Sequence, residues 1–317
     1  MTDVSVVILV GREELHIARC LEKLAALAPR QVFVVESQQE DRTHEIAVET
    51  GRSLKFEVSS LKFEVRSSKS DSLMFEVSSS NDSLPTSNCE HRTSNCSSTN
   101  IKLQTIFHPW PGNQAAQFQW ALDNLPIEAN WILRLDADEY LTPELIAEIQ
   151  ERLPKLPDAV AGIVLRRRHI WRDVWVKRGM YPTRILRIFR RGRGRSDGKL
   201  MDEHILVDGE SVEFQHDFVD HSLIPLEEWE AKHRNYARRE AQSFLAGEKS
   251  TGAKGRLKWC YYHLLPSFAR PAIYWFRRAI VAGAYFESPE ARDFTRRHAF
   301  WYRSLVEREI RSLKLEV

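Results

Sequence analysis

The sequence predicts an α/β protein with a mostly parallel sheet, helices on the faces of that sheet, and a helical C-terminal region. Strand and helix patterns alternate over residues 1–51, apolar strand patterns return after residue 101, and helical spacing dominates from residue 226 onward. Ligands of such sheets gather at the carboxyl ends of the strands. Polar residues at those ends are therefore the first candidates for a functional site.

Hydrophobic spacing predicts the first strands and helices. The strands are Val4–Val10 and Gln31–Glu36, and the first helix is Glu13–Ala26. Asp41 is expected to cap a second helix that continues to Thr50. Gly51 is expected to end that helix.

Residues 52–100 break this alternation. The unit S-L-K-F-E-V occurs at Ser53–Val58 and Ser60–Val65, and a variant follows at Ser72–Val77. This serine-rich, low-complexity segment has little apolar material to offset its ordering entropy, so we predict a disordered insertion. Short strands are the alternative, because apolar and charged residues alternate in the unit. Cys89 and Cys96, each in a T-S-N-C repeat, are interpreted as repetition and not as a metal site.

The alternation then resumes. Strands are predicted at Lys102–Phe107, Trp131–Leu135, Ala161–Arg168 and Thr183–Phe189, with a helix at Gln114–Leu125. One of these strands delivers Asp136 and Asp138 into a turn. Magnesium and manganese prefer carboxylate oxygens and are usually completed by water and phosphates, so this D-x-D predicts a metal-diphosphate site. The alternative is an acidic turn before a helix that Thr142 caps and Pro143 begins.

Composition narrows the class of protein. The 317 residues carry a net charge of +2, which gives no strong global field. The arginines are not interleaved with a recognised nucleic-acid-binding module, so no nucleic-acid partner is expected. The four cysteines form no C-x-x-C pair, the first residues lack a signal-peptide pattern, and no apolar run reaches membrane-spanning length. We therefore expect a cytoplasmic location.

Four separated blocks resemble the family 2 glycosyltransferases of the Rossmann-like GT-A fold. They are V-S-V-V-I-L-V-G-R-E-E at Val4–Glu14, V-F-V-V-E-S-Q-Q-E-D-R-T at Val32–Thr43, H-P-W-P-G-N-Q-A-A-Q-F-Q-W-A-L at His108–Leu122, and L-R-L-D-A-D-E-Y at Leu133–Tyr140. In particular, the chain resembles bacterial members that build lipopolysaccharide core and other surface polysaccharides. The resemblance implies a nucleotide-sugar-binding and catalytic domain at 1–51 and 101–225, followed by a helical region at 226–317.

The resemblance implies transfer of a sugar from a nucleotide-sugar donor to a saccharide or lipid-linked acceptor. A divalent cation, Mn²⁺ or Mg²⁺, would bridge the D-x-D and the donor diphosphate and act as a Lewis acid. Asp138 would be the direct metal ligand, and Asp136 would reach the ribose or a metal-bound water. His221 would return to the metal or diphosphate, with His204 and His216 as alternatives.

The resemblance also implies a nucleotide pocket after the first strands. Its candidate residues are Glu13, Glu36, Gly112, Asn113, Asp136 and Arg184. Arg187 is expected to join Arg184 on the diphosphate. The family usually has proline, threonine, an aromatic residue and asparagine where this chain has Leu9–Arg12, and aspartate in place of Glu36. For Glu13, a role in the first turn of a helix is the alternative.

An inverting transfer, as in the family, needs a carboxylate that takes the proton of the acceptor hydroxyl. In related enzymes a His-Glu pair follows an arginine-rich strand. This pattern matches Glu203, with Asp202 as the alternative. Trp171, Trp175 and Tyr181 either stack on a sugar ring or belong to the core.

The segment Trp259–Phe286 mixes aromatic and arginine side chains, as a helix at an anionic membrane interface does. A helix pair packed on the catalytic domain is the alternative. The membrane interpretation predicts peripheral contact at the inner face of the cell membrane and suits a lipid-linked acceptor.

Two other functions are compatible with the sequence. A nucleotidyltransferase also holds carboxylates beside a nucleotide, but it usually has a glycine-rich phosphate loop that Gly11 alone does not supply. A catalytically silent homologue with a binding role would account for the altered Leu9–Arg12 segment and for the repeats.

Overall fold

The computed structural model describes residues 1–38, 40–65, 75–80, 101–199, 203–246 and 264–315. The chain divides into two compact units, and each is described by itself. The first comprises Met1–Val164, Leu186–Arg195 and Ile205–His216, and the second comprises Leu165–Ile185, Ser196–His204 and Asp217–Val317.

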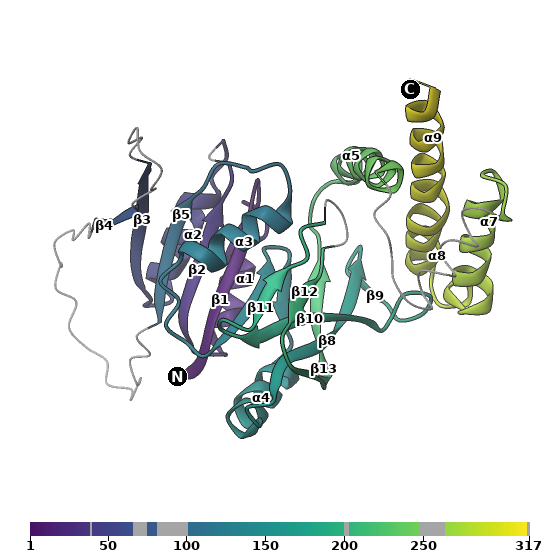
Figure 1. The fold of residues 1–317 in the computed structure, drawn as a ribbon. Coiled ribbons are helices and arrows are strands. Elements are labelled where there is room, and N and C mark those ends of the chain that lie inside the picture. The colour runs from purple at the N-terminus through teal and green to yellow at the C-terminus, as the bar shows by residue number, and fades with distance from the viewer. Residues whose placement is uncertain (39, 66–74, 81–100, 200–202, 247–263, 316–317) are drawn as a thin grey trace. The chain divides into compact units, whose positions relative to one another are not determined.

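A large mixed sheet forms the centre of the first unit (Figure 1). Its strands are β1 (Thr2–Val10), β2 (Pro29–Glu36), β3 (Glu57–Val65), β4 (Phe75–Ser80), β5 (Lys102–Phe107), β6 (Trp131–Asp136), β7 (Glu139–Leu141), β8 (Val160–Trp171), β10 (Thr183–Arg190) and β13 (Glu210–His221). Parts of β8, β10 and β13 belong to the second unit. They follow the order β4-β3-β5-β2-β1-β6-β10-β8-β13-β7. β1 is parallel to β2 and β6, and β5 is parallel to β2 and β3, whereas β10 is antiparallel to β6.

Helices cover both faces of this sheet. They are α1 (Ile17–Ala25), α2 (Thr43–Ser53), α3 (Gln114–Asn124) and α4 (Pro143–Arg152), with a short turn η1 (Leu153–Lys155). α3 packs Phe118 into the same core cluster as Phe33 of β2. α2 lies on the other face, because its Gly51 meets Leu103, which pairs with Val32, the neighbour of Phe33. The predicted α/β fold with a mostly parallel, helix-flanked sheet is confirmed.

Two helix boundaries differ from the prediction. The first helix begins at Ile17, because Glu13 stands before a turn and its carbonyl accepts the N–H of Ile17 at 3.0 Å. Gly51 does not end the second helix, which continues to Ser53. An added Cβ at Gly51 would lie 2.3 Å from Cδ2 of Leu103. This glycine therefore permits close packing of α2 on β5 and is not a helix terminus.

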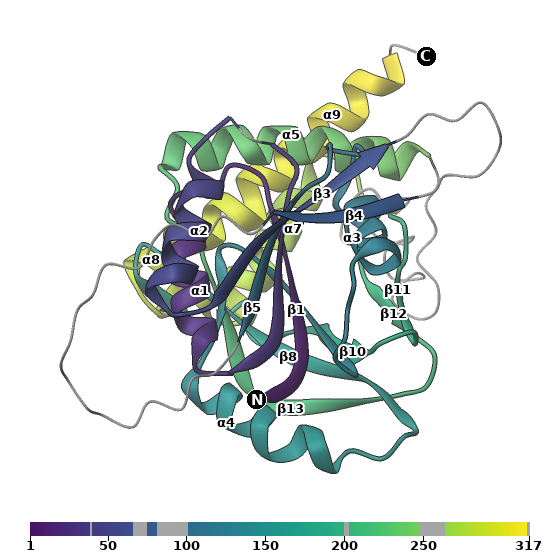
Figure 2. The ribbon, with the colours of Figure 1, turned by 90° about the vertical axis from the view of Figure 1, so that its left-hand side faces the viewer.

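Part of the repetitive segment adds two strands at an edge of the sheet (Figures 1 and 2). β3 pairs in parallel with β5 and antiparallel with β4, and Phe56 and Leu61 are buried. The structure thus has short strands, the alternative interpretation, at these positions. The disordered insertion remains a prediction for the rest of the segment. Cys89 and Cys96 lie outside the described residues.

The second unit is mostly helical from Leu226 onward. It contains β9 (Val174–Val176), α5 (Leu226–Leu245), α7 (Ala269–Phe276), η2 (Arg277–Val281), η3 (Ala284–Phe286), α8 (Pro289–Thr295), η4 (Arg296–Trp301) and α9 (Tyr302–Leu315). α5 and α9 share a core around Ala241 and Val306, and Trp171, Trp229 and Phe294 belong to another. None of the helices in the described ranges is long and apolar enough to cross a membrane. A small two-stranded sheet, β11 (Gly194–Ser196) with β12 (Ile205–Val207), completes the strands.

Candidate functional site

The carboxyl ends of four parallel strands meet at one edge of the sheet in the first unit. Val10 of β1 lies beside Glu36 of β2, and Leu9 lies beside Asp136 of β6. On the other side of β2, Glu36 pairs with Phe107 of β5. The structure therefore brings the strand ends at Glu36 and Asp136 to the same edge, with β1 between them.

The D-x-D occupies the turn between β6 and β7. Asp136 ends β6, Asp138 is half-buried in the turn, and Glu139 begins β7. The N–H of Asp136 donates to Oε2 of Glu139 at 3.0 Å, which closes the turn. Further on, Oγ1 of Thr142 accepts the N–H of Leu145 at 3.2 Å and caps α4. The acidic turn thus leads into a capped helix, so the two interpretations of this stretch are compatible.

Two buried arginines lie against the carboxylates of this turn. Arg187 of β10 pairs with Glu139, and its Nη2 lies 3.4 Å from Oδ2 of Asp136. Nη2 of Arg134 lies 3.6 Å from Oδ1 of Asp136. Burial by itself would lower the pKa of Arg187, but the charges of Glu139 and Asp136 outweigh burial and raise it. Arg187 is therefore held in its cationic form against the turn.

Arg184 belongs to the second unit and Arg187 to the first, so a diphosphate contact of Arg184 remains a prediction. The two are three residues apart in β10, and side chains alternate along a strand, so they point to opposite faces. Arg184 is exposed, whereas Arg187 is buried against Glu139. Glu139 and Arg134 were not predicted as site residues, although both lie close to the D-x-D in the chain.

The charge around the D-x-D fits a cation. Cys20 of α1 is buried, and burial together with the negative charges of Glu139, Asp138 and Asp136 raises the pKa of its thiol. The positive charge of Arg19 opposes these effects and lowers that pKa. Among the described residues, no group of three or more histidine, cysteine, aspartate or glutamate side chains could hold a metal alone. The D-x-D fits Mn²⁺ or Mg²⁺ as part of a site that water and diphosphate oxygens complete.

Glu36 is buried at the end of β2 and is bonded to a histidine that the sequence did not single out. Nδ1 of His44, in α2, donates to Oε1 of Glu36 at 2.8 Å. This hydrogen bond, opposed by burial, raises the pKa of His44. A contact between Glu36 and the donor base remains a prediction, and such a contact would compete with His44.

Glu13 closes the turn before α1. Its Oε2 lies 2.6 Å from Nδ1 of His16, and its N–H donates to Oγ1 of Thr43 at 2.8 Å. Asp41 accepts the N–H and the hydroxyl of Thr43 at 3.2 and 2.7 Å. These contacts match the helix-turn alternative for Glu13. Its contact with a nucleotide remains a prediction.

The H-P-W-P-G-N-Q block forms the approach to α3. Oδ1 of Asn113 accepts the N–H of Ala116 at 2.7 Å and caps the helix. Gly112 has a φ of 103°, a conformation that favours glycine. The ring of His108 stacks on Trp120 at a centroid distance of 3.9 Å. Local geometry therefore accounts for Gly112 and Asn113, and their nucleotide contacts remain predictions.

The predicted catalytic base, Glu203, lies in a loop of the second unit whose ends are joined by a hydrogen bond. Glu203 is half-buried between β11 and β12, and Asp202 lies outside the described residues. The N–H of Asp197 donates to the carbonyl of His204 at 2.9 Å, which closes the loop at its base. Burial would raise the pKa of Asp197, but hydrogen bonds from the side chain and backbone around Lys199 and His204 lower it.

The three histidines considered as metal ligands have separate partners. Nε2 of His221, at the end of β13 in the second unit, lies 3.2 Å from Oδ1 of Asp173. His204 is exposed, and Nδ1 of His216 lies 2.8 Å from Oε2 of Glu148 in the first unit. The first unit by itself joins Asp136, Glu139 and Arg187. A metal role for His221 remains a prediction.

The aromatic residues considered for sugar stacking differ from one another. Trp171 belongs to a core cluster, and its Nε1 donates to Oδ2 of Asp293 at 3.2 Å. Trp175 and Tyr181 are half-buried and meet edge to face at 5.3 Å. The hydroxyl of Tyr181 donates to Oδ1 of Asp217 at 3.0 Å. Trp171 is therefore structural, and Trp175 with Tyr181 stays an acceptor-side prediction.

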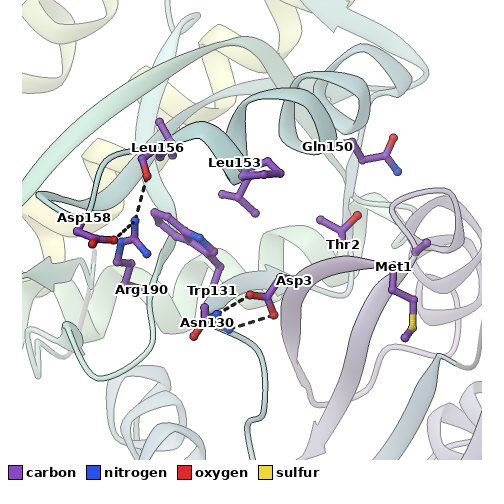
Figure 3. A pocket seen from close by; sticks show the side chains of 12 residues that line it. Met1, Thr2, Asp3, Asn130, Trp131, Gln150, Leu153, Leu156, Asp158 and Arg190 are labelled. Carbon is purple, nitrogen blue, oxygen red and sulfur yellow. Dashed lines mark hydrogen bonds and ion pairs between the residues drawn. The ribbon is translucent and has the colours of Figure 1, made fainter.

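A cavity of about 560 Å³ opens at the opposite end of the parallel strands (Figure 3). Asp3 and Trp131, at the starts of β1 and β6, belong to its lining. Nδ2 of Asn130 donates to Oδ2 of Asp3 at 2.7 Å, and Nη2 of Arg190 donates to the carbonyl of Leu156 at 3.3 Å. Sheets of this kind bind ligands at the carboxyl ends of their strands, whereas this cavity lies at the amino ends.

The fold and the site define an α/β protein with two acidic residues, Asp136 and Asp138, at the carboxyl edge of its sheet. No family model matches the sequence. No curated protein matches it either.

Solved structures with similar topology exist. The mannosyltransferase PcManGT from Pyrobaculum calidifontis, in complex with GDP-Man and Mn²⁺, is 13% identical, covers 99% of this chain and 86% of its own, and has a TM-score of 0.48. TarS of S. aureus is 11% identical over 100% of this chain and 92% of its own, with a TM-score of 0.42. Glucosyl-3-phosphoglycerate synthase from Mycobacterium tuberculosis, in complex with Mn²⁺, UDP and phosphoglyceric acid, is 10% identical over 76% and 78%, with a TM-score of 0.39. Similarity at this level assigns no reaction to this chain.

Proposed function

We propose that this chain is a metal-dependent, inverting glycosyltransferase. It moves a sugar from a nucleotide-sugar donor to a saccharide or lipid-linked acceptor in the synthesis of a cell-envelope polysaccharide. The proposal joins the sequence resemblance to family 2 glycosyltransferases with the geometry of the D-x-D.

The observation that carries the proposal is the position of the D-x-D. Asp136 ends a central parallel strand, Asp138 follows in the turn, and the end of β2 at Glu36 lies one strand away across β1. A nucleotide at this edge would place its diphosphate next to the two carboxylates. Arg187 and Arg134 hold Asp136, and the family resemblance assigns direct metal contact to Asp138.

The residues divide the chemistry among them. A bound Mn²⁺ or Mg²⁺ supplies Lewis-acid stabilisation of the charge that develops on the departing nucleoside diphosphate. Asp138 binds this cation, and Arg187 fixes Asp136 in the orientation needed for the ribose or a metal-bound water. Glu203, or Asp202 beside it, takes the proton of the acceptor hydroxyl, and His221 assists at the diphosphate.

A nucleotide-release screen with Mn²⁺ tests the proposal. Purified protein is incubated with UDP- and GDP-sugars, and release of the nucleoside diphosphate is measured with and without saccharide acceptors. Asp138→Ala is expected to lower turnover by at least about 100-fold, because the metal loses its direct ligand. The melting temperature should be preserved, since Asp138 lies in a half-buried turn.

Asp158→Ala is the matched control, because this aspartate is fully exposed and far along the chain from the D-x-D. It should retain wild-type turnover. Calorimetry with nucleoside diphosphates and Mn²⁺ separates the remaining outcomes. Absence of both binding and release with every donor would favour the catalytically silent homologue, for which the bond between Glu36 and His44 is the supporting observation.

A further inference from the structure

The C-terminal region of the chain contains a long stretch of sequence without acidic residues. It lies between Glu248 and Glu287, and its cationic residues are Lys249, Lys254, Arg256, Lys258, Arg270, Arg277 and Arg278. The described part, residues 264–286, contains α7, η2 and η3. Within this described part, Nη1 of Arg270 pairs with Oε2 of Glu307 at 2.9 Å, and Nη1 of Arg278 donates to the carbonyl of Gly179 at 2.9 Å. Arg277 is exposed.

The same helices expose large apolar side chains, which we call the apolar face. Its members are Leu264, Phe268, Ile273, Phe276, Val281, Tyr285 and Phe286. Phe268 is 79% exposed, Val281 71% and Phe286 66%. Phe268, Ala272 and Phe276 follow each other at a spacing of four residues, so they share one side of α7. A contiguous exposed surface of this kind marks an interaction site.

Arginines and aromatic rings stand beside the apolar face. A cavity of about 260 Å³ is lined by Trp275, Tyr285, Arg292 and Arg296 among others. The guanidinium of Arg292 lies 5.6 Å from the ring centre of Tyr285, and the Arg277 side chain is exposed next to Phe276. Aromatic rings and arginines next to exposed apolar side chains are what a membrane interface favours.

The nearest carboxylates are already engaged. Glu287 accepts the backbone N–H groups of Lys177 and Arg178 at 2.7 and 2.8 Å. Asp293 accepts Nε of Arg297 at 3.0 Å and also pairs with Nη2 of Arg296 at 3.2 Å. In a twofold dimer through this face, the arginines of one copy would face the arginines of the other. The stretch between Glu248 and Glu287 has no acidic side chain that could pair with them. The charge favours an anionic surface over self-association.

We propose that the apolar face docks on the surface of an anionic lipid bilayer. The phenylalanines and Val281 enter the boundary between headgroups and acyl chains, while Arg277, Arg292 and Arg296 lie at the level of the lipid phosphates. This surface deepens the proposed function by stating how the enzyme reaches a lipid-linked acceptor. It does not depend on which sugar is transferred.

Vesicle flotation of the full chain tests the docking. At low salt the protein should float with vesicles of phosphatidylcholine and phosphatidylglycerol and stay at the bottom with phosphatidylcholine alone. Phe276→Glu and Arg277→Glu should each lower the bound fraction by about tenfold or more, since one inserts a charge into the boundary and the other reverses an attraction. Leu315→Glu and Arg308→Glu, exposed positions on α9, are the matched controls and should float like the wild type.

Failure to float with anionic vesicles overturns the proposal. So does an equal loss in the α9 controls. Sedimentation velocity tests whether a second copy of the chain binds the apolar face instead. If the protein does not float but forms a concentration-dependent dimer, and Phe276→Glu abolishes that dimer, the face is a dimer interface. Nucleotide release measured with a free saccharide acceptor should not change in Phe276→Glu. Loss of docking and failure of the glycosyltransferase proposal are therefore separate results.

Discussion

At the scale of single residues, the site depends on charges that are buried in pairs. Arg187 and Glu139 are each about 5% exposed or less, and they contact one another beside Asp136. Such a pair contributes little net stability by its presence, but loss of one member leaves the other charge buried and unpaired. Arg187 therefore acts on the D-x-D as a positioning residue and on the fold as a counter-ion.

Arg187→Met should lower the free energy of unfolding by about 3–5 kcal/mol, because Glu139 would remain buried without its partner. Urea denaturation at pH 7 measures this change. Adding Glu139→Gln to the same variant should recover most of the loss, since the uncompensated charge is then removed. Lys155→Met breaks an exposed pair with Glu151 and should cost no more than about 0.5 kcal/mol. Equal effects of the two methionine variants would contradict the buried-pair explanation.

Sequence reasoning found the carboxylates of this site more readily than their partners. Asp136 and Asp138 are separated by one residue at the end of an apolar strand, so the local pattern identifies them. Arg187 reaches Asp136 from a strand that lies far along the chain, and His44 reaches Glu36 from the following helix. Neither pairing has a local signal, because each depends on which strands and helices become neighbours.

At the scale of elements, α2 shows how packing overrides a local rule. Glycine near the end of a helical pattern is a usual stop signal, but Gly51 lies inside α2, against β5. A helix stop signal and the close packing of a helix on a strand both favour glycine. Only the position of the neighbouring strand distinguishes them.

Gly51→Ala should destabilise the protein by about 1–3 kcal/mol, since its Cβ would lie 2.3 Å from Leu103 and 3.1 Å from Val58. Helix propensity alone predicts a gain of about 1 kcal/mol, so the sign decides between the explanations. Thermal and urea denaturation provide the measurement. Leu103→Ala should cost less in the Gly51→Ala background than alone. Gly11→Ala, with nothing nearer than Ser37 Oγ at 3.8 Å, is the control with room for a methyl group.

The helical core of the second unit should be sensitive to acid through His233. Burial lowers the pKa of His233 from 6.5 to about 4, and the positive charge of Lys232 adds to this effect. The hydrogen bond from His233 to the carbonyl of Trp229 and the charge of Asp220 act in the opposite direction. The unfolded chain then binds more protons than the folded chain between pH 6.5 and 4, so stability falls as the pH is lowered through this window.

The expected loss from this group is on the order of 2 kcal/mol at pH 4 relative to pH 7. Urea denaturation across that range, in wild type and His233→Phe, measures it. The phenylalanine variant should keep the stacking on Trp229 and show a smaller loss between pH 6.5 and 4. His204→Gln, at an exposed position, should follow the wild type. A variant curve parallel to the wild-type curve would rule out this histidine as the source.

At the scale of the whole molecule, the repetitive segment is proposed to be a dispensable insertion that nevertheless adds to the core. Glu57 pairs with Lys102, and its N–H donates to the carbonyl of Ile101 at 2.8 Å. The chain therefore returns next to the point where it left. Leu61 joins the apolar cluster of the sheet, so removal is not expected to be neutral.

Deletion of residues 57–100, with Phe56 joined to Ile101, should give a folded protein. The melting temperature should fall by roughly 5 °C, because burial of Leu61 and the pairing of β5 with β3 are lost. Nucleotide release should persist, since the D-x-D does not lie in the deleted segment. Circular dichroism, a thermal melt and the release assay provide the measurements. A chain that fails to fold would show that the segment is integral to the fold.

The sequence by itself determined the alternation of strands and helices, the parallel sheet, and the arrival of Asp136 and Asp138 at a strand end, because these follow from periodicity and from neighbours in the chain. Only the tertiary structure decided that Arg187 reaches the D-x-D, that His44 holds Glu36, that part of the repeats forms edge strands, and that apolar side chains of α7 remain exposed. Each of these depends on which distant segments pack together, and burial, pairing and exposure are set by that packing and not by local order.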